Sequence, residues 1–262
     1  MSLELYHNDM SVCAAKVRIV FAEKDLAWQG IHMNLRAGDT QKPEYLKLNP
    51  NAVVPTLVHD GRVIVESTVI CEYLDDAFPR TPLRPDGPLD RAQMRQWTKQ
   101  LDEGLHAAVG TLSTCIAFRH QHMQKTPAQL RAYLEGIPLP EVRERRQQEI
   151  ELGMQSPAFA PALRRWNKLF GQAEAALHDS AWLAGETYSL ADIAYVPYAI
   201  RLEHLGLEAL WRERPRVAQW RTRLFARQSY KEAVEKWFNP GFLEIFEAQR
   251  PAARSKAKEL VE

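Results

Sequence analysis

The sequence predicts an α/β domain followed by an all-helical domain, and three observations support this prediction. Short strand-like and helix-like segments alternate over the first 80 residues. A proline-rich stretch, PRTPLRPDGP, then occupies residues 79–88 and is typical of an extended linker. Beyond it, apolar residues recur at three- and four-residue steps, which indicates helices. We therefore expect domains at residues 1–80 and 89–250, a linker at 81–88 and a tail at 251–262.

The first domain has a signal for each of its elements. Alternation of apolar and polar residues indicates a strand, and a stripe such as Val17, Val20 and Phe21 indicates a helix. Asp60-Gly61 is a strong hairpin turn signal. The expected elements are a strand at 3–6, a helix at 13–24, a strand at 28–34, a helix at 44–48, strands at 56–58 and 63–65, and a helix capped by Ser67 and ended by Pro79. Their order is βαβαββα.

The second domain is expected to be a helical bundle. A single long helix is predicted from Asp90 to about His122, because one face carries an unbroken apolar stripe. Further helices are predicted near residues 160–178, 189–205, 215–228 and 240–249. The tail beyond Arg250 has few apolar residues, so we expect it to be loosely held.

Composition excludes several classes of function. The 34 basic and 33 acidic side chains nearly cancel, so we expect neither a nucleic-acid nor a membrane partner. The three cysteines, Cys13, Cys71 and Cys115, form neither a disulfide framework nor a zinc motif, and the histidines lack metal-ligand spacing. We expect no metal. The polar N-terminus is unlike a secretory signal and no apolar run approaches the ~20 residues of a membrane span, which favours a cytoplasmic protein.

Two short segments predict a clamp for a peptide with a free amino-acid end. In the first, NAVVPTL, Pro55 stands at a strand start, where a cis Val54-Pro55 bond would expose the Val54 N–H and C=O. In the second, Glu66-Ser67 lies where a strand passes into a helix. The Ser67 hydroxyl and the first helical N–H groups can hold a carboxylate, and Glu66 can accept from an ammonium group.

Three motifs in the same order resemble the glutathione transferase superfamily: SVCAAKVRIVFAEKDL, YLKLNPNAVVPTLVHDGRVIVESTVICEYLDDAFP and YSLADIAYVPY. The resemblance implies a thioredoxin-like N-terminal domain, an all-helical C-terminal domain, glutathione as co-substrate and a homodimer. It also implies that Val54, beside a cis Pro55, pairs with the cysteinyl backbone of glutathione, and that Glu66 and Ser67 hold the γ-glutamyl end. Asp192 and Ser189 belong to a helix-capping motif and are expected to be structural.

The group that activates the glutathione thiol is expected to be Ser11. A hydroxyl at a helix N-terminus can stabilise a thiolate through one hydrogen bond and the helix dipole. The resemblance aligns Ser11 with the catalytic hydroxyl of zeta-like members and with the catalytic cysteine of omega-like members. Cys13, as a nucleophile, is the direct rival, and Tyr6 is the reserve. Lys16 and Arg18 are interpreted as solvated helix charges.

An apolar or aromatic electrophile is expected to bind between the domains, with Met10, Trp97, Leu101, Leu105 and Phe118 as candidate contacts by position. RAQMRQWTKQLDE and GIPLPEVRERRQQEIELGMQSPAF look like bacterial glutathione-dependent β-etherases, although residues 11–15 resemble that group less well. Three hypotheses stand. One is a transferase, including a β-etherase; one is a zeta-like isomerase; and one is a non-catalytic glutathione-fold binding protein.

Overall fold

The computed structural model describes residues 2–137 and 139–261, and the chain divides into two compact units. Each unit is assembled from segments that are distant in the sequence. Unit 1 comprises residues 1–98, 179–199 and 220–239, and unit 2 comprises residues 99–178, 200–219 and 240–262.

The core of unit 1 is built on a four-stranded sheet. Its strands are β1 (Leu3–His7), β2 (Gln29–His32), β3 (Thr56–His59) and β4 (Arg62–Val65). The spatial order is β2-β1-β3-β4, with β1 and β2 parallel and the other pairs antiparallel. The parallel pair needs a crossover helix and the last pair needs only a tight turn, as the predicted order requires.

The strand register brings four chain segments to one end of this sheet. Tyr6 pairs with Thr56, and Thr56 pairs with Val65. His7 pairs with His32 in the parallel pair. The segments that follow β1, β2 and β4 and the segment that precedes β3 therefore share this end. They contain Ser11, Val54-Pro55 and Glu66-Ser67.

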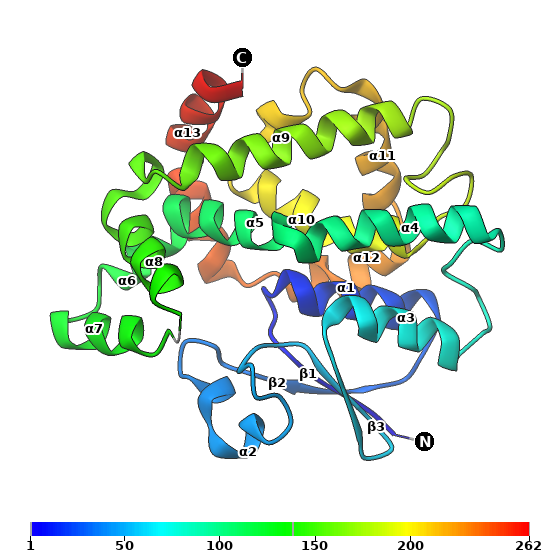
Figure 1. The fold of residues 1–262 in the computed structure, drawn as a ribbon, viewed down its shortest axis with the longest axis horizontal. Helices are drawn as coiled ribbons and strands as arrows, with labels where there is room; N and C mark the ends of the chain where they lie inside the picture. The colour runs from blue at the N-terminus through cyan, green and yellow to red at the C-terminus, as the bar shows by residue number, and fades with distance from the viewer. Residues whose placement is uncertain (1, 138, 262) are drawn as a thin grey trace. The chain divides into compact units, whose positions relative to one another are not determined.

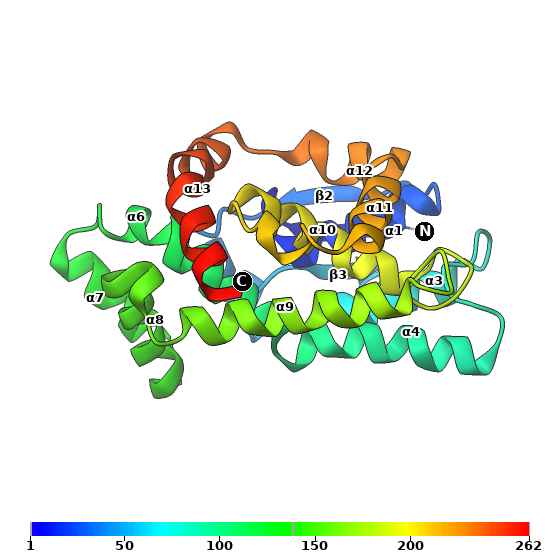
Figure 2. The same ribbon diagram turned by 90° about the horizontal axis from the view of Figure 1, so that it is seen from above.

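Several helices of unit 1 pack around the sheet or on the helices that cover it. They are α1 (Val12–Glu23), η1 (Asp39–Gln41), α2 (Pro43–Leu46), α3 (Ser67–Ala77), α4 (Pro88–Gln100, with residues to Thr98 in this unit), α12 (Gln228–Ala233) and η6 (Glu235–Trp237). Figure 1 shows α1 and α3 side by side over one face of the sheet, and α2 on the other side. In Figure 2, α12 lies against α1.

Two sequence predictions about these helices are wrong. Ser67 is the first residue of α3 and not its cap; Glu66, with a φ of 69°, occupies the cap position. Lys16 and Arg18 are not solvated, since they are 1% and 2% exposed. Helix α1 packs against both α3 and α12. The faces of α1 that would be solvent-exposed on a surface helix are therefore buried.

The predicted capping motif is present at the start of α10 (Leu190–His204). Ser189 Oγ accepts from the Ala191 N–H, and Asp192 Oδ2 accepts from the Ser189 N–H at 3.1 Å. Asp192 Oδ1 also accepts from the Leu183 N–H at 3.0 Å and from Trp220 Nε1 at 2.8 Å. Trp220 belongs to α11 (Pro215–Phe225). The carboxylate therefore joins α10 to α11, and burial raises its pKa to about 6.

Unit 2 is helical, as predicted. Its elements are the π-helical turn η2 (Leu101–Leu105), α5 (His106–Ser113), the π-helical turn η3 (Thr114–Phe118), α6 (Arg119–His122), α7 (Pro127–Glu135), α8 (Pro140–Leu152), η4 (Gly153–Gln155), α9 (Phe159–Ala176), η5 (Glu208–Leu210) and α13 (Pro240–Val261). Helices α5 and α9 pack together (Figure 1). No helix in the described part of the chain has the length and hydropathy needed to cross a membrane.

The chain is helical from Pro88 to His122, as predicted, but it contains two π-helical turns, and the backbone leaves helical geometry at Gly104. Gly104 has a φ of 131°, a conformation that glycine adopts without a Cβ penalty. Arg165 Nη2 donates to the Glu103 carbonyl at 2.7 Å, and the Arg165 guanidinium fills the space where a Cβ would stand. The apolar stripe continues through such a turn, which is why periodicity alone concealed it.

The tail is more ordered than predicted. Helix α13 continues through Pro251 to Val261, and Ala253 and Ala257 are fully buried. Arg254 Nη2 donates to Glu208 Oε1 at 2.7 Å. Small alanines pack closely without a long apolar stripe, so the sequence lacked the usual signal of a docked helix.

Candidate functional site

Ser11 lies at the sheet end defined above and caps α1. Its backbone is extended, with φ −72° and ψ 117°, and its Oγ accepts from the Ala14 N–H at 3.2 Å. A hydroxyl can accept and donate at once, and the proton of Ser11 is donated to no group among the described residues. The half-buried side chain can therefore donate to a ligand.

Backbone groups beside Ser11 differ in their availability. The Ser11 N–H already donates to the Asn8 carbonyl at 3.3 Å. The Val12 N–H, at the first position of α1, donates to nothing in residues 2–137 and 139–261. The start of α1 thus offers a hydroxyl, a free N–H and the positive end of a 12-residue helix, a combination that favours an anion.

The two rivals of Ser11 have packing partners. Cys13 is partly buried, with its Sγ 3.7 Å from the hydroxyl of the buried Tyr198. The Tyr6 ring lies 5.6 Å from the Tyr45 ring and packs against the cluster of Met33, Tyr45 and Val54. These contacts give each residue a structural role in unit 1.

The Val54-Pro55 peptide bond is cis. Neither the N–H nor the C=O of Val54 has a partner among the described residues. The preceding carbonyl, that of Val53, is held by Tyr45 Oη at 2.5 Å and by Asn49 Nδ2 at 2.9 Å. Tyr45 and Asn49 thus fix this loop while leaving the Val54 backbone free, a support that the sequence reading missed.

Glu66 and Ser67 occupy the start of α3 at the same sheet end. Glu66 is exposed and has a positive φ, which is uncommon outside glycine. The Ser67 N–H and Oγ have no partner in the described chain. A helix start with an unpaired N–H and hydroxyl fits a carboxylate, and outliers of this kind cluster at binding sites.

An arginine that the sequence reading placed in solvent supports the segment before Ser11. Arg18 Nη1 donates to the Asn8 carbonyl at 3.0 Å, and Nη2 donates to the Asp9 carbonyl at 3.0 Å. Its Nε donates to the Ala233 carbonyl at 2.8 Å. Burial lowers the pKa of this guanidinium to about 9. Charge and spacing gave no hint of this role, since a cation on a predicted helix is usually solvated.

The candidate electrophile contacts are distributed over both units. Met10 and Trp97 belong to unit 1, and Leu101, Leu105 and Phe118 belong to unit 2. Tyr195 Oη donates to the Trp97 carbonyl at 2.8 Å. Leu101 is fully buried, and Phe118 packs against Phe242 and Phe246. Leu101 and Phe118 thus have core contacts in unit 2.

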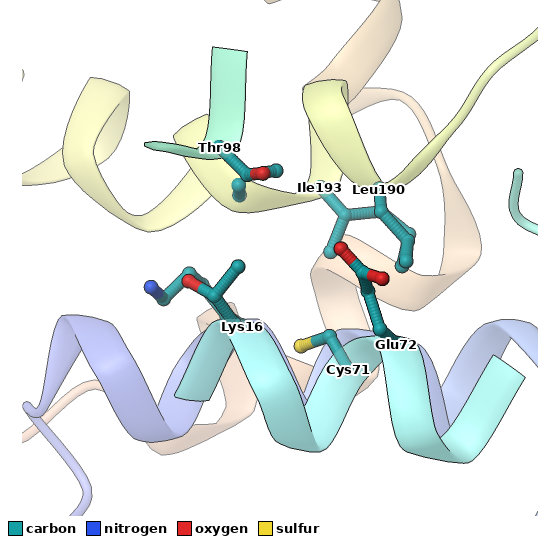
Figure 3. A pocket seen from close by; sticks show the side chains of 8 residues that line it. Lys16, Cys71, Glu72, Thr98, Leu190 and Ile193 are labelled. Atoms are coloured by element: carbon teal, nitrogen blue, oxygen red, sulfur yellow. The ribbon is translucent and has the colours of Figure 1, made fainter. Parts of the chain in front are cut away.

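A small pocket in unit 1 is lined by residues of α1, α3, α4 and α10. Figure 3 shows Lys16 of α1, Cys71 and Glu72 of α3, and Leu190 and Ile193 of α10 around it. Its volume of about 10 Å³ accommodates one water molecule at most, so it cannot hold a tripeptide. No group of three or more His, Cys, Asp or Glu side chains in residues 2–137 and 139–261 is placed to hold a metal ion.

Family models match both parts of this architecture. The model "Glutathione S-transferase, N-terminal domain" matches residues 5–82, and the model "Glutathione S-transferase, C-terminal domain" matches residues 154–228. The chain belongs to the glutathione S-transferase superfamily.

Among its relatives, Protein LigF of Sphingobium sp. (strain NBRC 103272 / SYK-6) is 29% identical over 243 residues, which cover 90% of this chain and 94% of LigF. The crystal structure of the β-etherase LigF superimposes with a TM-score of 0.79 over 90% of this chain and 100% of that chain. Maleylacetoacetate isomerase of Dictyostelium discoideum is 39% identical over 94 residues, which cover 35% of this chain and 43% of the isomerase.

Proposed function

We propose that this protein binds glutathione and activates its thiol for attack on an apolar or aromatic electrophile. The Ser11 hydroxyl donates to the thiolate, and the Val54 N–H and C=O pair with the cysteinyl backbone beside Pro55. The start of α3 holds the γ-glutamyl carboxylate through Ser67, while the exposed Glu66 accepts from its ammonium group.

One observation carries this proposal. Groups with unused hydrogen-bonding capacity come together at one end of the sheet: the Ser11 proton, the Val54 peptide groups and the Ser67 N–H and hydroxyl. Buried or half-buried polar groups normally have partners. An extended peptide with a carboxylate, an ammonium group and a thiol supplies the missing ones.

The chemistry requires a thiolate at neutral pH. A free thiol with a pKa near 8.5 is mostly protonated there. A hydroxyl donor, the Val12 N–H and the dipole of α1 all favour the anion, so they lower the pKa of a sulfur bound beside Ser11. The proton leaves to solvent, and the thiolate is the nucleophile.

For the particular reaction we favour glutathione-dependent cleavage of a β-aryl ether. LigF, which is similar over almost its whole length, is a β-etherase. In this step the thiolate forms a C–S bond at the carbon next to a carbonyl, the C–O bond breaks, and a phenolate leaves and takes up a proton from solvent. Its chemistry needs no metal.

A zeta-like isomerase is the second candidate. A stretch of 94 residues, about a third of the chain, is similar to a maleylacetoacetate isomerase. Cys13 also follows Ser11 by two residues, as the zeta-like pattern has it. In that reaction glutathione adds to the substrate and is released again, so it is not consumed. A non-catalytic binding protein is the third reading; the intact clamp at Val54 and Ser67 argues against it.

We also propose that the protein is a cytoplasmic homodimer, as family membership suggests. Unit 1 presents the exposed apolar side chains Val63 and Val69, which a partner subunit could cover. Analytical ultracentrifugation at micromolar concentration tests this state directly, and a sedimenting mass of one chain would contradict it.

The test of function is incubation with glutathione and three electrophiles. They are 1-chloro-2,4-dinitrobenzene, an α-keto aryl ether and maleylacetoacetate, each followed by product analysis. We expect release of the phenol from the ether with one glutathione consumed per phenol. Isomerisation without glutathione consumption would support the second candidate. Calorimetric binding of glutathione with turnover of none of the three would favour the binding protein.

A further inference from the structure

Arg18 is a buried cation whose described contacts include no carboxylate ion pair. Its guanidinium donates to three backbone carbonyls, those of Asn8, Asp9 and Ala233, and lies 4.8 Å from the centroid of the Trp237 ring. Burying a charge in this way is costly unless its donors are satisfied. The planar fork of arginine matches several carbonyls at once, which lysine cannot do.

Two of these three carbonyls belong to the segment that positions Ser11. The Asn8 carbonyl accepts from Arg18 Nη1 at 3.0 Å and also from the Ser11 N–H at 3.3 Å. The Asp9 carbonyl accepts from Nη2 at 3.0 Å. Arg18 therefore fixes the peptide group to which Ser11 itself is bonded.

Side-chain contacts complete the support of this segment. Asn8 Nδ2 donates to the Met33 carbonyl at 3.0 Å, and its Oδ1 accepts from the Met10 N–H at 3.1 Å. Asp9 Oδ2 accepts from Asn239 Nδ2 at 2.9 Å. His7 Nδ1 lies 3.4 Å from Arg18 Nη1 and must accept there, because a guanidinium only donates.

We propose that Arg18 is a positioning residue for the thiol-activating hydroxyl, acting on Ser11 through the Asn8 and Asp9 carbonyls. This inference rests on the proposed role of Ser11. The Ala233 carbonyl, the Trp237 ring and Asn239 make residues 233–239 of unit 1 the other anchor of the same support. Residues 233–239 thereby help to fix the position of the Ser11 hydroxyl.

The test compares Arg18→Met and Arg18→Lys with Arg227→Met. Arg227 is the matched control. Its side chain, at the start of α12, donates to Glu23 of α1 at 2.7 Å, and it contacts none of residues 8–11 in the described chain. For each variant one measures kcat, the KM for glutathione, and the pKa of enzyme-bound glutathione from thiolate absorbance near 240 nm.

We expect Arg18→Met to lower kcat about 10- to 100-fold, to change the KM for glutathione less than about threefold, and to raise the bound thiol pKa toward the value of free glutathione. Arg18→Lys keeps a charge but loses the fork, so its values should lie between. Arg227→Met should lower the free energy of unfolding. Its kcat should stay within about twofold of the wild-type value, and the pKa of the bound thiol should change by no more than about 0.2.

Two results overturn the inference and remain distinguishable. If Arg18→Lys, or a folded Arg18→Met, keeps the wild-type kcat and thiol pKa, Arg18 has only a structural role and the proposed function stands. If wild-type protein fails to bind glutathione in a calorimeter, the proposed function fails and the role of Arg18 falls with it.

Discussion

Ser11 Oγ lies 3.2 Å from the backbone nitrogen of Ala14 and accepts its hydrogen bond at the start of α1. The same oxygen keeps its own proton for a ligand, because accepting uses only a lone pair. Capping therefore orients the hydroxyl before any ligand arrives, and a preorganised donor stabilises an anion without reorganisation at the moment of reaction.

Replacing Ser11 by alanine is expected to lower kcat about 100-fold, the effect of removing one preorganised donor to a developing or bound anion. The lost cap should also lower the free energy of unfolding by about 1 kcal/mol. Steady-state kinetics and urea unfolding measure the two effects. Cys13→Ala is the control and should keep kcat within about twofold. Loss of activity in Cys13→Ala with full activity in Ser11→Ala would assign the chemistry to the thiol.

Replacing Ser67 by alanine should weaken glutathione binding about tenfold and leave kcat at saturation within about twofold. The hydroxyl contributes one hydrogen bond to the bound carboxylate in both ground and transition states. Isothermal titration calorimetry gives the Kd. Thr126→Ala removes a comparable hydroxyl from the start of α7 and should leave the Kd unchanged. Equal glutathione affinities for Ser67→Ala and wild type would contradict the proposed binding of the carboxylate at the start of α3.

Replacing Asp192 by alanine is expected to lower the free energy of unfolding by about 3 kcal/mol. The change leaves the Leu183 N–H, the Ser189 N–H and Trp220 Nε1 buried without their acceptor. Chemical denaturation measures it, with Asp86→Ala at an exposed position as control. A loss no larger than the control's, about 0.5 kcal/mol or less, would mean that α10 and α11 do not depend on this carboxylate.

Acidification should destabilise the protein through His7. Burial, then the nearby Arg18 cation and His32, lowers the His7 pKa from 6.5 to about 4. Between about pH 6.5 and about pH 4, His7 is protonated in the unfolded chain but stays neutral in the folded chain. The free energy of unfolding therefore falls as the pH falls through that range. The gap corresponds to about 3 kcal/mol at most.

The measurement for His7 is urea unfolding at pH 7.5 and pH 5 for wild type and His7→Gln. His204, whose pKa burial also lowers to about 4, acts in the same direction. Asp192, with its pKa raised to about 6, acts in the opposite direction. Only the difference between variant and wild type isolates His7. If wild type and His7→Gln lost the same free energy of unfolding between pH 7.5 and pH 5, His7 would not be a source of the acid sensitivity.

The hairpin turn and the cis Val54-Pro55 bond could be predicted from the sequence because their signals are local. Asp60 and Gly61 have φ values of 46° and 79°, which the Asp-Gly pair accommodates in a tight hairpin turn. Val54-Pro55 and Glu66-Ser67 were each recognised from their position beside a predicted strand, and the observed strand register places both at the same end of the sheet. Their role in binding glutathione stays a prediction.

Features that depend on distant partners could not be predicted. In the sequence, Arg18 has the pattern of a solvent-exposed helix residue. It is buried because its guanidinium donates to the carbonyl of Ala233, more than 200 positions later in the chain. At Gly104 the backbone leaves helical geometry, and Arg165, 61 positions later in the chain, fills the space beside it and donates to the neighbouring carbonyl. A single glycine in an apolar stripe does not predict such a partner. Lys16 is buried for the same reason: the helices that cover α1 come from remote parts of the chain.

A crystal structure with glutathione bound tests the central proposal most directly. The proposal predicts that the glutathione sulfur lies within about 3.5 Å of Ser11 Oγ, with the cysteinyl backbone paired to Val54 and the γ-glutamyl carboxylate at the start of α3. A sulfur out of hydrogen-bond reach of Ser11 Oγ and bonded instead to Cys13 or Tyr6 would contradict it.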